Sequence, residues 1–293
     1  MQSKKLGFLF AILDMGTFGL LPVVSHYFVA TMDPLVFSGA ATLIGSIPLI
    51  FWLGTKNKLN QLYSKKYLPN LLLLAVLSTI GSILYFVGTK FTSGLNTGLL
   101  TQIEPFYAIL LAVIVLKEVI GKNQIFATLL MVLGAGIVIY KGAMGFNIGD
   151  ILVLLSPLVM QVSHLFAKKV YEKHADSNLV PTARLLFSGL LLLLIAMFVS
   201  PSSLAQLLSV KVIISVVFFG IVFRCLDFVL WYQAISRISV SKASAVIPLA
   251  VAISFVGSVF FLKESVSGYQ LFGLFFILGG LIWLSKIHLA EEK

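Results

Sequence analysis

Two stretches of the chain decide its fold: LLAVIVLKEVIGKNQIFATLLMVLGAGIVIY at residues 110–140 and VGSVFFLKESVSGYQLFGLFFILGGLIWLSK at residues 256–286. In each stretch an apolar run ends at Leu-Lys-Glu, and a second long apolar run follows after a few polar residues. A helix needs about 20 mostly apolar residues to cross a hydrocarbon core about 30 Å thick. We therefore expect each stretch to hold the end of one membrane-spanning helix and the whole of the next.

The rest of the chain has the same pattern of long apolar runs and short connections. Of its 293 residues, 59% are hydrophobic, and the mean hydropathy of +1.05 is too high for one soluble core. In hydrocarbon the backbone must satisfy its own hydrogen bonds, so the spans are expected to be helices. We predict an all-α polytopic membrane protein. Ten transmembrane helices are predicted, at residues 6–29, 35–54, 68–89, 95–117, 123–140, 149–170, 179–200, 211–234, 240–262 and 268–286.

The basic residues predict the orientation of these helices. With the N-terminus placed inside, fifteen lysines and arginines fall on the cytoplasmic side: Lys4, Lys5, Lys56, Lys58, Lys65, Lys66, Lys117, Lys122, Lys168, Lys169, Lys173, Arg237, Lys242, Lys286 and Lys293. The opposite side receives four, namely Lys90, Lys141, Lys211 and Lys263. This bias predicts a multi-pass protein of the cell (inner, cytoplasmic) membrane with both termini cytoplasmic. The net charge of +10 is then a sign of topology, and no nucleic-acid partner is expected.

The two halves of the chain resemble each other. Shared features recur in corresponding places: Leu116-Lys117-Glu118, Gln124, Phe126 and Gly134 in the first half, and Leu262-Lys263-Glu264, Gln270, Phe272 and Gly280 in the second. We predict a first five-helix repeat over residues 1–145 and a second over residues 146–293. Because five is odd, the second copy enters the membrane inverted. Inverted repeats are the architecture of secondary transporters, although a duplicated bundle without transport is the alternative.

The five-plus-five arrangement and the paired Leu-Lys-Glu motifs resemble the drug/metabolite transporter superfamily, specifically its EamA-type repeats. The resemblance covers essentially the whole chain. It implies a carrier of small metabolites that works by alternating access. It also implies a central cavity lined largely by the first, third, fourth, sixth, eighth and ninth spans. Arg184 matches an arginine often found near the start of the seventh helix in this family.

Five ionisable residues are predicted within spans: Asp14, Glu104, Arg184, Arg224 and Asp227. Each costs about 2.5–3.5 kcal/mol on insertion scales, so such groups usually face a cavity or a partner. Arg224, Asp227 and Trp231 are spaced to share a helical face. Two readings stay open: an ion pair that fixes the eighth helix, or an arginine offered to a substrate carboxylate and oriented by Asp227.

Glu104 is our first candidate for a functional residue. It belongs to a stripe on the fourth helix with Thr97, Thr101 and Ala108, and Pro105 follows it directly. A proline removes a backbone donor and loosens its turn. In the ninth helix Pro248 stands at a similar depth, with Ser244 shortly before it. Interrupted helices in corresponding places of two halves point to a transport site.

Asp14 lies with Thr17 on one face of the first helix and is a candidate for proton relay or cation contact. Three acids against two arginines leave one carboxylate without a permanent partner, which a coupling proton or a cationic group of the substrate can occupy. Further candidates for the substrate cavity are Ser82 and Tyr85 in the third helix, Tyr107 in the fourth, and Gln161 beside His164 in the sixth. The small-xxx-small patterns Gly94-xxx-Gly98 and Ser254-xxx-Ser258 predict close helix packing. Lys117-Glu118 and Lys263-Glu264 are read as helix caps or gate latches.

The sequence thus predicts a secondary carrier of a small polar or zwitterionic, amino-acid-like metabolite, with the lipid bilayer as its environment and a monomer or weak homodimer as its state. A nucleoside-like or adenosyl-type cationic metabolite is the alternative, because Trp231, Tyr85 and Tyr107 could stack a ring. An integral-membrane enzyme or a lipid scramblase is more distant. The four histidines are scattered, so neither a metal nor a cofactor is expected. With no glycine-rich phosphate loop, an ATP-driven pump is not expected either.

Overall fold

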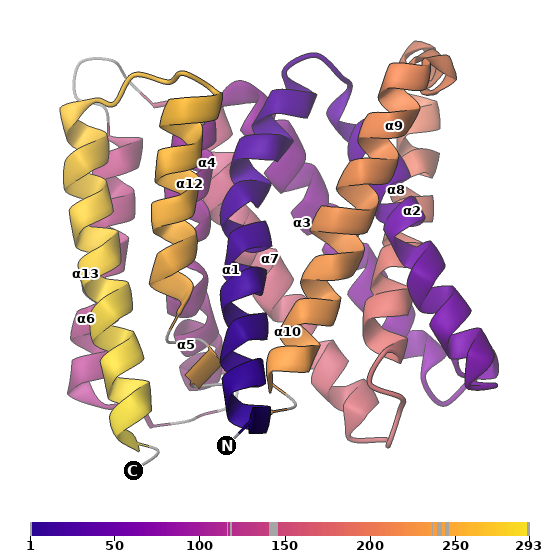
Figure 1. Cartoon of the computed structure of the whole chain (residues 1–293), viewed down its shortest axis with the longest axis horizontal. Coiled ribbons are helices and arrows are strands. Elements are labelled where there is room, and N and C mark those ends of the chain that lie inside the picture. Colours follow the sequence, from indigo (N-terminus) through magenta and orange to yellow (C-terminus); the bar gives the residue numbers. More distant parts are fainter. Residues whose placement is uncertain are drawn as a thin grey trace. The chain divides into compact units, whose positions relative to one another are not determined.

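A computed structural model of the chain describes residues 2–115, 117, 119–140, 146–235, 237–238, 242–243 and 246–291. Every regular element in these ranges is a helix (Figure 1). In chain order the elements are α1 (Gln2–Val29), α2 (Pro34–Thr55), η1 (Leu59–Tyr63), α3 (Leu68–Phe91), α4 (Gly94–Thr101), α5 (Glu104–Ile114), α6 (Lys122–Ile139), α7 (Ile148–Tyr171), α8 (Leu179–Val199), η3 (Pro201–Leu208), α9 (Val210–Phe219), η4 (Gly220–Leu226), α10 (Asp227–Ile235), α12 (Ile247–Phe261) and α13 (Gly268–Glu291).

The helices confirm the predicted membrane fold. Within the described residues, nine helical segments are long and apolar enough to cross a membrane, and α12 is a tenth, shorter apolar helix. Large apolar side chains on several helices point outward, with Phe198 81% exposed and Phe51 and Phe260 each 74% exposed. Exposed apolar surface of this extent is expected where lipid replaces water.

Two predicted helices differ from a regular α-helix. The fourth span is interrupted between α4 and α5, where the N–H groups of Gln102 and Ile103 reach back only three residues, to the carbonyls of Leu99 and Leu100. Pro105, just beyond, has no N–H to continue the helix. The predicted loosened turn at the proline is confirmed, and the predicted stripe from Thr97 to Glu104 crosses this interruption.

The eighth span contains the second irregularity. It consists of α9, the π-helical segment η4 and α10 in direct succession. A π turn holds more residues than an α turn, so a three-residue spacing no longer returns a side chain to the same face. The prediction that Arg224, Asp227 and Trp231 share a face assumed regular α-helical geometry, which this helix does not have.

The two halves share backbone details at equivalent positions. Lys117 and Lys263 follow α5 and α12 with φ of 56° and 55°, a left-handed conformation uncommon outside glycine. At the start of α6 the Gln124 side chain accepts a hydrogen bond from the Gly121 N–H at 3.1 Å. At the start of α13 the Gln270 side chain accepts one from the Ser267 N–H at 2.9 Å. The repeat read from the sequence thus reappears in the way its helices end and begin.

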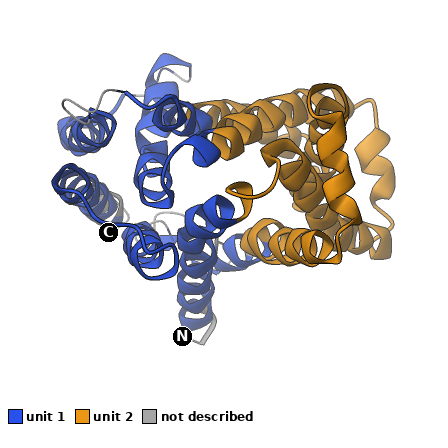
Figure 2. Ribbon diagram, turned by 90° about the horizontal axis from the view of Figure 1, so that it is seen from above, with its two compact units in different colours: residues 1–27, 88–157, 229–293 blue, residues 28–87, 158–228 orange. Residues whose placement is uncertain are grey.

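The chain forms two compact units, each of which takes helices from both halves (Figure 2). Unit 1 comprises residues 1–27, 88–157 and 229–293, and within it α6 packs along α13 and α4 packs against α12. Unit 2 comprises residues 28–87 and 158–228, and within it α2 packs along α8. Each of these pairs joins equivalent helices of the two halves.

The small-xxx-small prediction is confirmed for the packing of α4 on α12. A Cβ atom on Gly98 would collide with the side chain of Ser254, and one on Gly94 would collide with Leu262. The absence of side chains at both glycines lets the two helices approach closely. Gly94-xxx-Gly98 therefore holds together one helix from each half.

Candidate functional site

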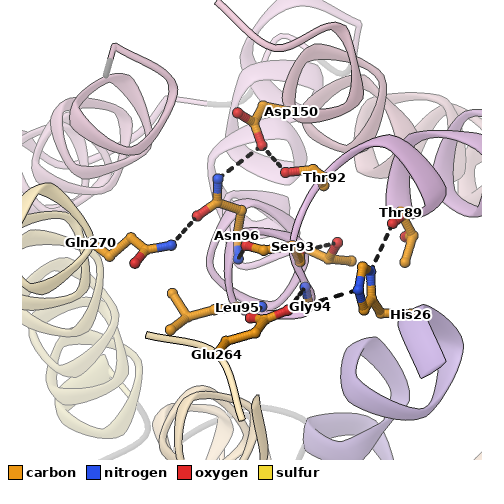
Figure 3. Close-up of polar contacts among 11 residues, drawn as sticks. His26, Thr89, Thr92, Ser93, Gly94, Leu95, Asn96, Asp150, Glu264 and Gln270 are labelled. Carbon is orange, nitrogen blue, oxygen red and sulfur yellow. Dashed lines mark hydrogen bonds and ion pairs between the residues drawn. The ribbon is translucent and has the colours of Figure 1, made fainter. Parts of the chain in front are cut away.

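Glu264, in the connection between α12 and α13, caps the N-terminus of α4 (Figure 3). Its Oε1 accepts a hydrogen bond from the Gly94 N–H at 2.7 Å, and its Oε2 accepts one from the Leu95 N–H at 2.8 Å. Ser93 provides the regular N-cap, since its hydroxyl accepts from the Asn96 N–H at 3.0 Å. A carboxylate at a helix N-terminus is stabilised both by the free N–H groups and by the helix dipole. The cap reading of Lys263-Glu264 is confirmed.

His26 connects the end of α1 to the same carboxylate. Its Nε2 lies 3.8 Å from Glu264 Oε1, an ion pair when the ring is doubly protonated. Its Nδ1 lies 3.0 Å from the carbonyl oxygen of Thr89, which can only accept, so Nδ1 donates. Glu264 therefore links α1, α4 and the connection that precedes α13.

A second, fully buried network holds the first turn of α4 from its other side. Asp150, in the first turn of α7, accepts hydrogen bonds through Oδ1 from the Thr92 hydroxyl and, at 3.0 Å, from Asn96 Nδ2. Asn96 Oδ1 in turn accepts from Gln270 Nε2 at 2.7 Å. Asp150, Asn96 and Gln270 are each no more than 4% exposed. Side-chain networks of this kind rigidify a site when every member is satisfied.

A cavity of about 610 Å³ lies over this network within unit 1. Its lining is mostly polar and includes Thr92, Asn96, Lys263, Glu264, Tyr269 and Gln270. The volume falls within the range of about 300–1,000 Å³ that small-molecule pockets occupy. Glu264 therefore both caps α4 and lines a hollow of metabolite size.

Unit 2 contains a different kind of site, a buried guanidinium among aromatic rings. Arg224 in η4 stacks over Phe86 with 5.0 Å from Cζ to the ring centroid, and over Phe219 with 5.9 Å. The same guanidinium interacts electrostatically with Tyr85, Asp227 and Arg184. Arg224 Nε is buried and has no hydrogen-bond partner among the described residues.

Arg184 on α8 lies beside polar side chains of α7. Its Nη2 donates to the Ser163 hydroxyl at 3.0 Å, and its Nη1 lies 3.2 Å from His164 Nε2. The histidine nitrogen therefore acts as an acceptor in this contact, because a guanidinium has no lone pair to accept with. Arg184 and His164 therefore belong to one hydrogen-bonded group.

The predicted site residues divide between the two units. Unit 1 contains Asp14, Thr101, Glu104, Tyr107 and Trp231, and unit 2 contains Ser82, Tyr85, Gln161, Arg224 and Asp227. Ser244 lies outside the described residues. Within unit 2, Arg224 interacts electrostatically with two other predicted residues, Tyr85 and Asp227.

In unit 1 the predicted residues are spread over several elements. Asp14 is buried in α1, and the Thr17 hydroxyl donates to its carbonyl oxygen at 2.8 Å. Glu104 is the half-buried first residue of α5. The Tyr107 hydroxyl donates to the Leu154 carbonyl of α7 at 3.1 Å. Trp231 packs against a small apolar cluster that includes Ala11. Two of the three rings proposed for stacking, those of Tyr107 and Trp231, thus already have contacts within the protein.

Sequence reasoning missed Asp150, Asn96 and the rings that stack on Arg224, Phe86 and Phe219. Asp150 does not stand out in the sequence, because it lies at the start of a span, where a charged side chain has little energetic cost and is common. The sequence signal for this network is an acid, Asp150, and an amide, Asn96, each in the first turn of an apolar helix. In the described part of the chain, no three His, Cys, Asp or Glu side chains are grouped so that they could hold a metal ion.

Comparison with known proteins identifies the type of transporter fold. A family model described as the EamA-like transporter family matches the chain twice, at residues 5–140 and 147–286. An uncharacterised transporter of Bacillus subtilis, YyaM, is 24% identical and aligns over 95% of this chain and 92% of its own length. A Salmonella typhimurium protein named as a probable amino-acid metabolite efflux pump is 25% identical over 96% of this chain and 94% of its own length.

One solved crystal structure covers all of the chain. It superimposes with a TM-score of 0.64 at 17% sequence identity and covers 100% of this chain and 99% of the other. At this identity the likeness concerns the fold alone.

Proposed function

The chain belongs to the EamA-like transporter family, and from that premise we propose that it moves a small polar or zwitterionic, amino-acid-like metabolite across the cell membrane by alternating access. The observation that carries the proposal is the group around Arg224. A buried guanidinium in the π-helical part of a membrane-spanning helix interacts with an acid, Asp227, at the start of the next helical segment. Charges in such a place are costly and mark substrate or ion pathways.

The amino-acid class is supported by two independent observations. Arg224 and Asp227 offer one positive and one negative group, which complement the carboxylate and the ammonium of a zwitterion. The Salmonella typhimurium relative is named as a probable amino-acid metabolite efflux pump. A nucleoside-like substrate has less support, because the Tyr107 hydroxyl is hydrogen-bonded to a backbone carbonyl.

The contacts of Glu264 suggest how one side of the carrier closes. Under the orientation that places both termini in the cytoplasm, Lys263-Glu264 lies on the extracytoplasmic side. The proposed motion releases the α4 N-terminus from Glu264 when that side opens and restores the cap when it closes. Because Glu264 both caps α4 and lines the cavity, substrate entry and latch release are coupled in this scheme.

Glu104 and Asp14 are the proposed proton-coupling residues. Glu104 stands at the break between α4 and α5, and Asp14 is buried in the middle of α1. Each carries a carboxylate, a group that can bind and release a proton. A proton taken up by one of them would balance the cargo's charge during transport.

Counterflow in proteoliposomes tests the proposal. Vesicles that contain the purified protein are loaded with one unlabelled amino acid and exposed to a trace of the same compound in labelled form, with and without a pH gradient. We expect transient accumulation of at least one amino acid that protein-free vesicles do not show. Accumulation that also depends on the pH gradient should be lost in Glu104→Gln or Asp14→Asn.

The absence of counterflow for every amino acid would refute the substrate class. Movement of fluorescent phospholipids between leaflets in the same vesicles would favour the scramblase alternative. Consumption of a metabolite without its translocation would favour an enzyme. Unchanged pH dependence in both acid variants would remove proton coupling and leave the transport proposal intact.

A further inference from the structure

Arg224 in η4, with aromatic rings stacked on its guanidinium, has the features of a binding group for one part of the transported metabolite. We infer that Arg224, with Arg184 beside it, forms the subsite that takes the carboxylate group of the transported metabolite. This inference rests on the proposed function, and it names the protein atoms that recognise one chemical group of the cargo.

The backbone around Arg224 is built to hold this residue in an unusual position. Arg224 belongs to the π-helical segment Gly220–Leu226, and π segments inside α-helices occur frequently at functional sites. A Cβ on Gly220 would lie 2.5 Å from the Ala41 carbonyl oxygen, and one on Gly45 would lie 2.7 Å from Arg224 Cβ. These two glycines let η4 press directly against α2, so the Arg224 side chain starts from the helix–helix contact and not from the lipid face.

The rings next to Arg224 leave its hydrogen-bonding edge available. Phe86 and Phe219 lie against the guanidinium at the cation–π distances given above, and their own centroids are 5.9 Å apart in an edge-to-face arrangement. A cation–π contact uses the flat face of the guanidinium, whereas all five N–H groups point outward in its plane. The rings thus stabilise the charge and fix the plane without consuming a donor.

The donors of Arg224 are not all used within the protein. Arg224 Nε is buried and lacks a hydrogen-bond partner among the described residues, and a buried donor in this condition is unfavourable unless a ligand or water completes it. A ligand oxygen at this edge would satisfy a donor that the described part of the chain leaves open.

The charges of the group select the ligand. Arg224 interacts electrostatically with a second guanidinium, that of Arg184, and with one carboxylate, Asp227. Two positive charges and one negative charge sum to one positive charge, which a singly charged anion neutralises. A carboxylate has that charge, and its two oxygens match the planar fork of an arginine. A doubly charged phosphate would leave the group negative, so the carboxylate is the better match.

A purely structural role for Arg224 predicts something different. If Arg224 only held η4 in place through Asp227 and the aromatic rings, its replacement would change the unfolding temperature by the same amount whichever compound is added. A subsite predicts that the replacement removes the preference for carboxylates over uncharged analogues. The comparison between matched compounds therefore separates the two roles.

The experiment measures thermal unfolding of the purified full-length chain in detergent with paired compounds. The panel contains the standard amino acids, lactate, succinate and benzoate, each paired with the amide that replaces its carboxylate. Ligands that bind the folded state raise the unfolding temperature by mass action. We expect at least one carboxylate to stabilise the wild-type protein at a concentration about 10- to 100-fold below that of its amide, the range for a lost hydrogen bond to a charged group.

Three variants complete the experiment. Arg224→Gln should abolish the carboxylate preference, and Arg224→Lys, which keeps the charge but loses the fork, should reduce it and serves if the glutamine variant does not fold. Arg237→Gln is the matched control, because Arg237 also stacks over a ring, Phe10 at 5.1 Å, but donates to Gln233. This control should keep the full preference.

The inference is overturned if no carboxylate stabilises the wild-type protein, if the amides act equally well, or if both Arg224 variants keep the wild-type preference. Its failure is distinguishable from failure of the proposed function. Counterflow that persists with an unchanged carboxylate preference in Arg224→Gln would retain the transporter and reject the subsite. Carboxylate binding that depends on Arg224 without any counterflow would retain the subsite and reject transport.

Discussion

Replacement of Glu264 should loosen one helix end and leave the rest of the fold in place. Glu264→Ala removes two charge-assisted hydrogen bonds, of 2.7 and 2.8 Å, from the N–H groups of Gly94 and Leu95. Loss of a helix cap typically costs about 0.5–2 kcal/mol, and hydrogen bonds to charged groups are worth about 1.5–3 kcal/mol each. The Glu264 side chain is 17% exposed, so in the variant water can replace part of these hydrogen bonds. We therefore expect the free energy of local opening at the start of α4 to fall by about 2–4 kcal/mol.

Hydrogen exchange measured by mass spectrometry is the suitable assay, because it reports local opening. A local loss of that size corresponds to about a 30- to 900-fold decrease in protection of the amides at the start of α4. Glu264→Gln keeps one acceptor oxygen and should fall between the wild type and the alanine variant. Lys263→Ala, at the neighbouring exposed position, is the control and should leave α4 unchanged. Protection of α4 in Glu264→Ala equal to that in Lys263→Ala would refute the cap.

Two further predictions concern packing and pH. Gly98→Val forces a branched side chain into Ser254 and should destabilise the protein by about 1–3 kcal/mol, as overpacking does. Gly136→Ala is the control and should be neutral, because the space around Gly136 is open. Equal unfolding temperatures for the two variants would contradict the close packing of α4 on α12. Burial raises the pKa of the Asp176 carboxyl, but its hydrogen bond and charge interaction with Lys58 and a backbone N–H outweigh this and leave that pKa below its usual value. The Lys58–Asp176 pair therefore stabilises the fold at pH values above the unfolded pKa of about 3.9, and this stabilisation is lost as the pH falls through the folded pKa. Lys58→Ala should be less stable than the wild type by up to about 1 kcal/mol at neutral pH and equally stable in strong acid. Thermal unfolding measured across this pH range tests the prediction.

The helices were predictable because bilayer thickness fixes their length. Each span had to contain an uninterrupted apolar run, so runs such as 179–200 gave helices such as α8 within a few residues. The break near Pro105 was also readable, since a proline has a defined effect on a helix. The equivalent ends at Lys117 and Lys263 followed from the repeated Leu-Lys-Glu motif.

The contacts between distant segments were not predictable in the same way. The π-helical segment has no sequence signature beyond Gly220, where η4 packs closely against α2. The chain of hydrogen bonds from Asp150 through Asn96 to Gln270 joins three helices that lie far apart in the sequence. Helical periodicity gives the face of each residue on its own helix, but it does not say which neighbouring helix meets that face.

Alternating access, as proposed for this protein, requires that its two five-helix repeats have opposite orientations in the membrane. Lys117 and Lys263 are equivalent, exposed and alike in backbone conformation, so cysteines placed there in a Cys225→Ser background report the side on which each repeat ends. In intact cells treated with a membrane-impermeant maleimide, we predict labelling of Lys263→Cys at once and of Lys117→Cys only after the membrane is permeabilised. Labelling of both cysteines from the same side would contradict the inverted repeat and the transport mechanism built on it.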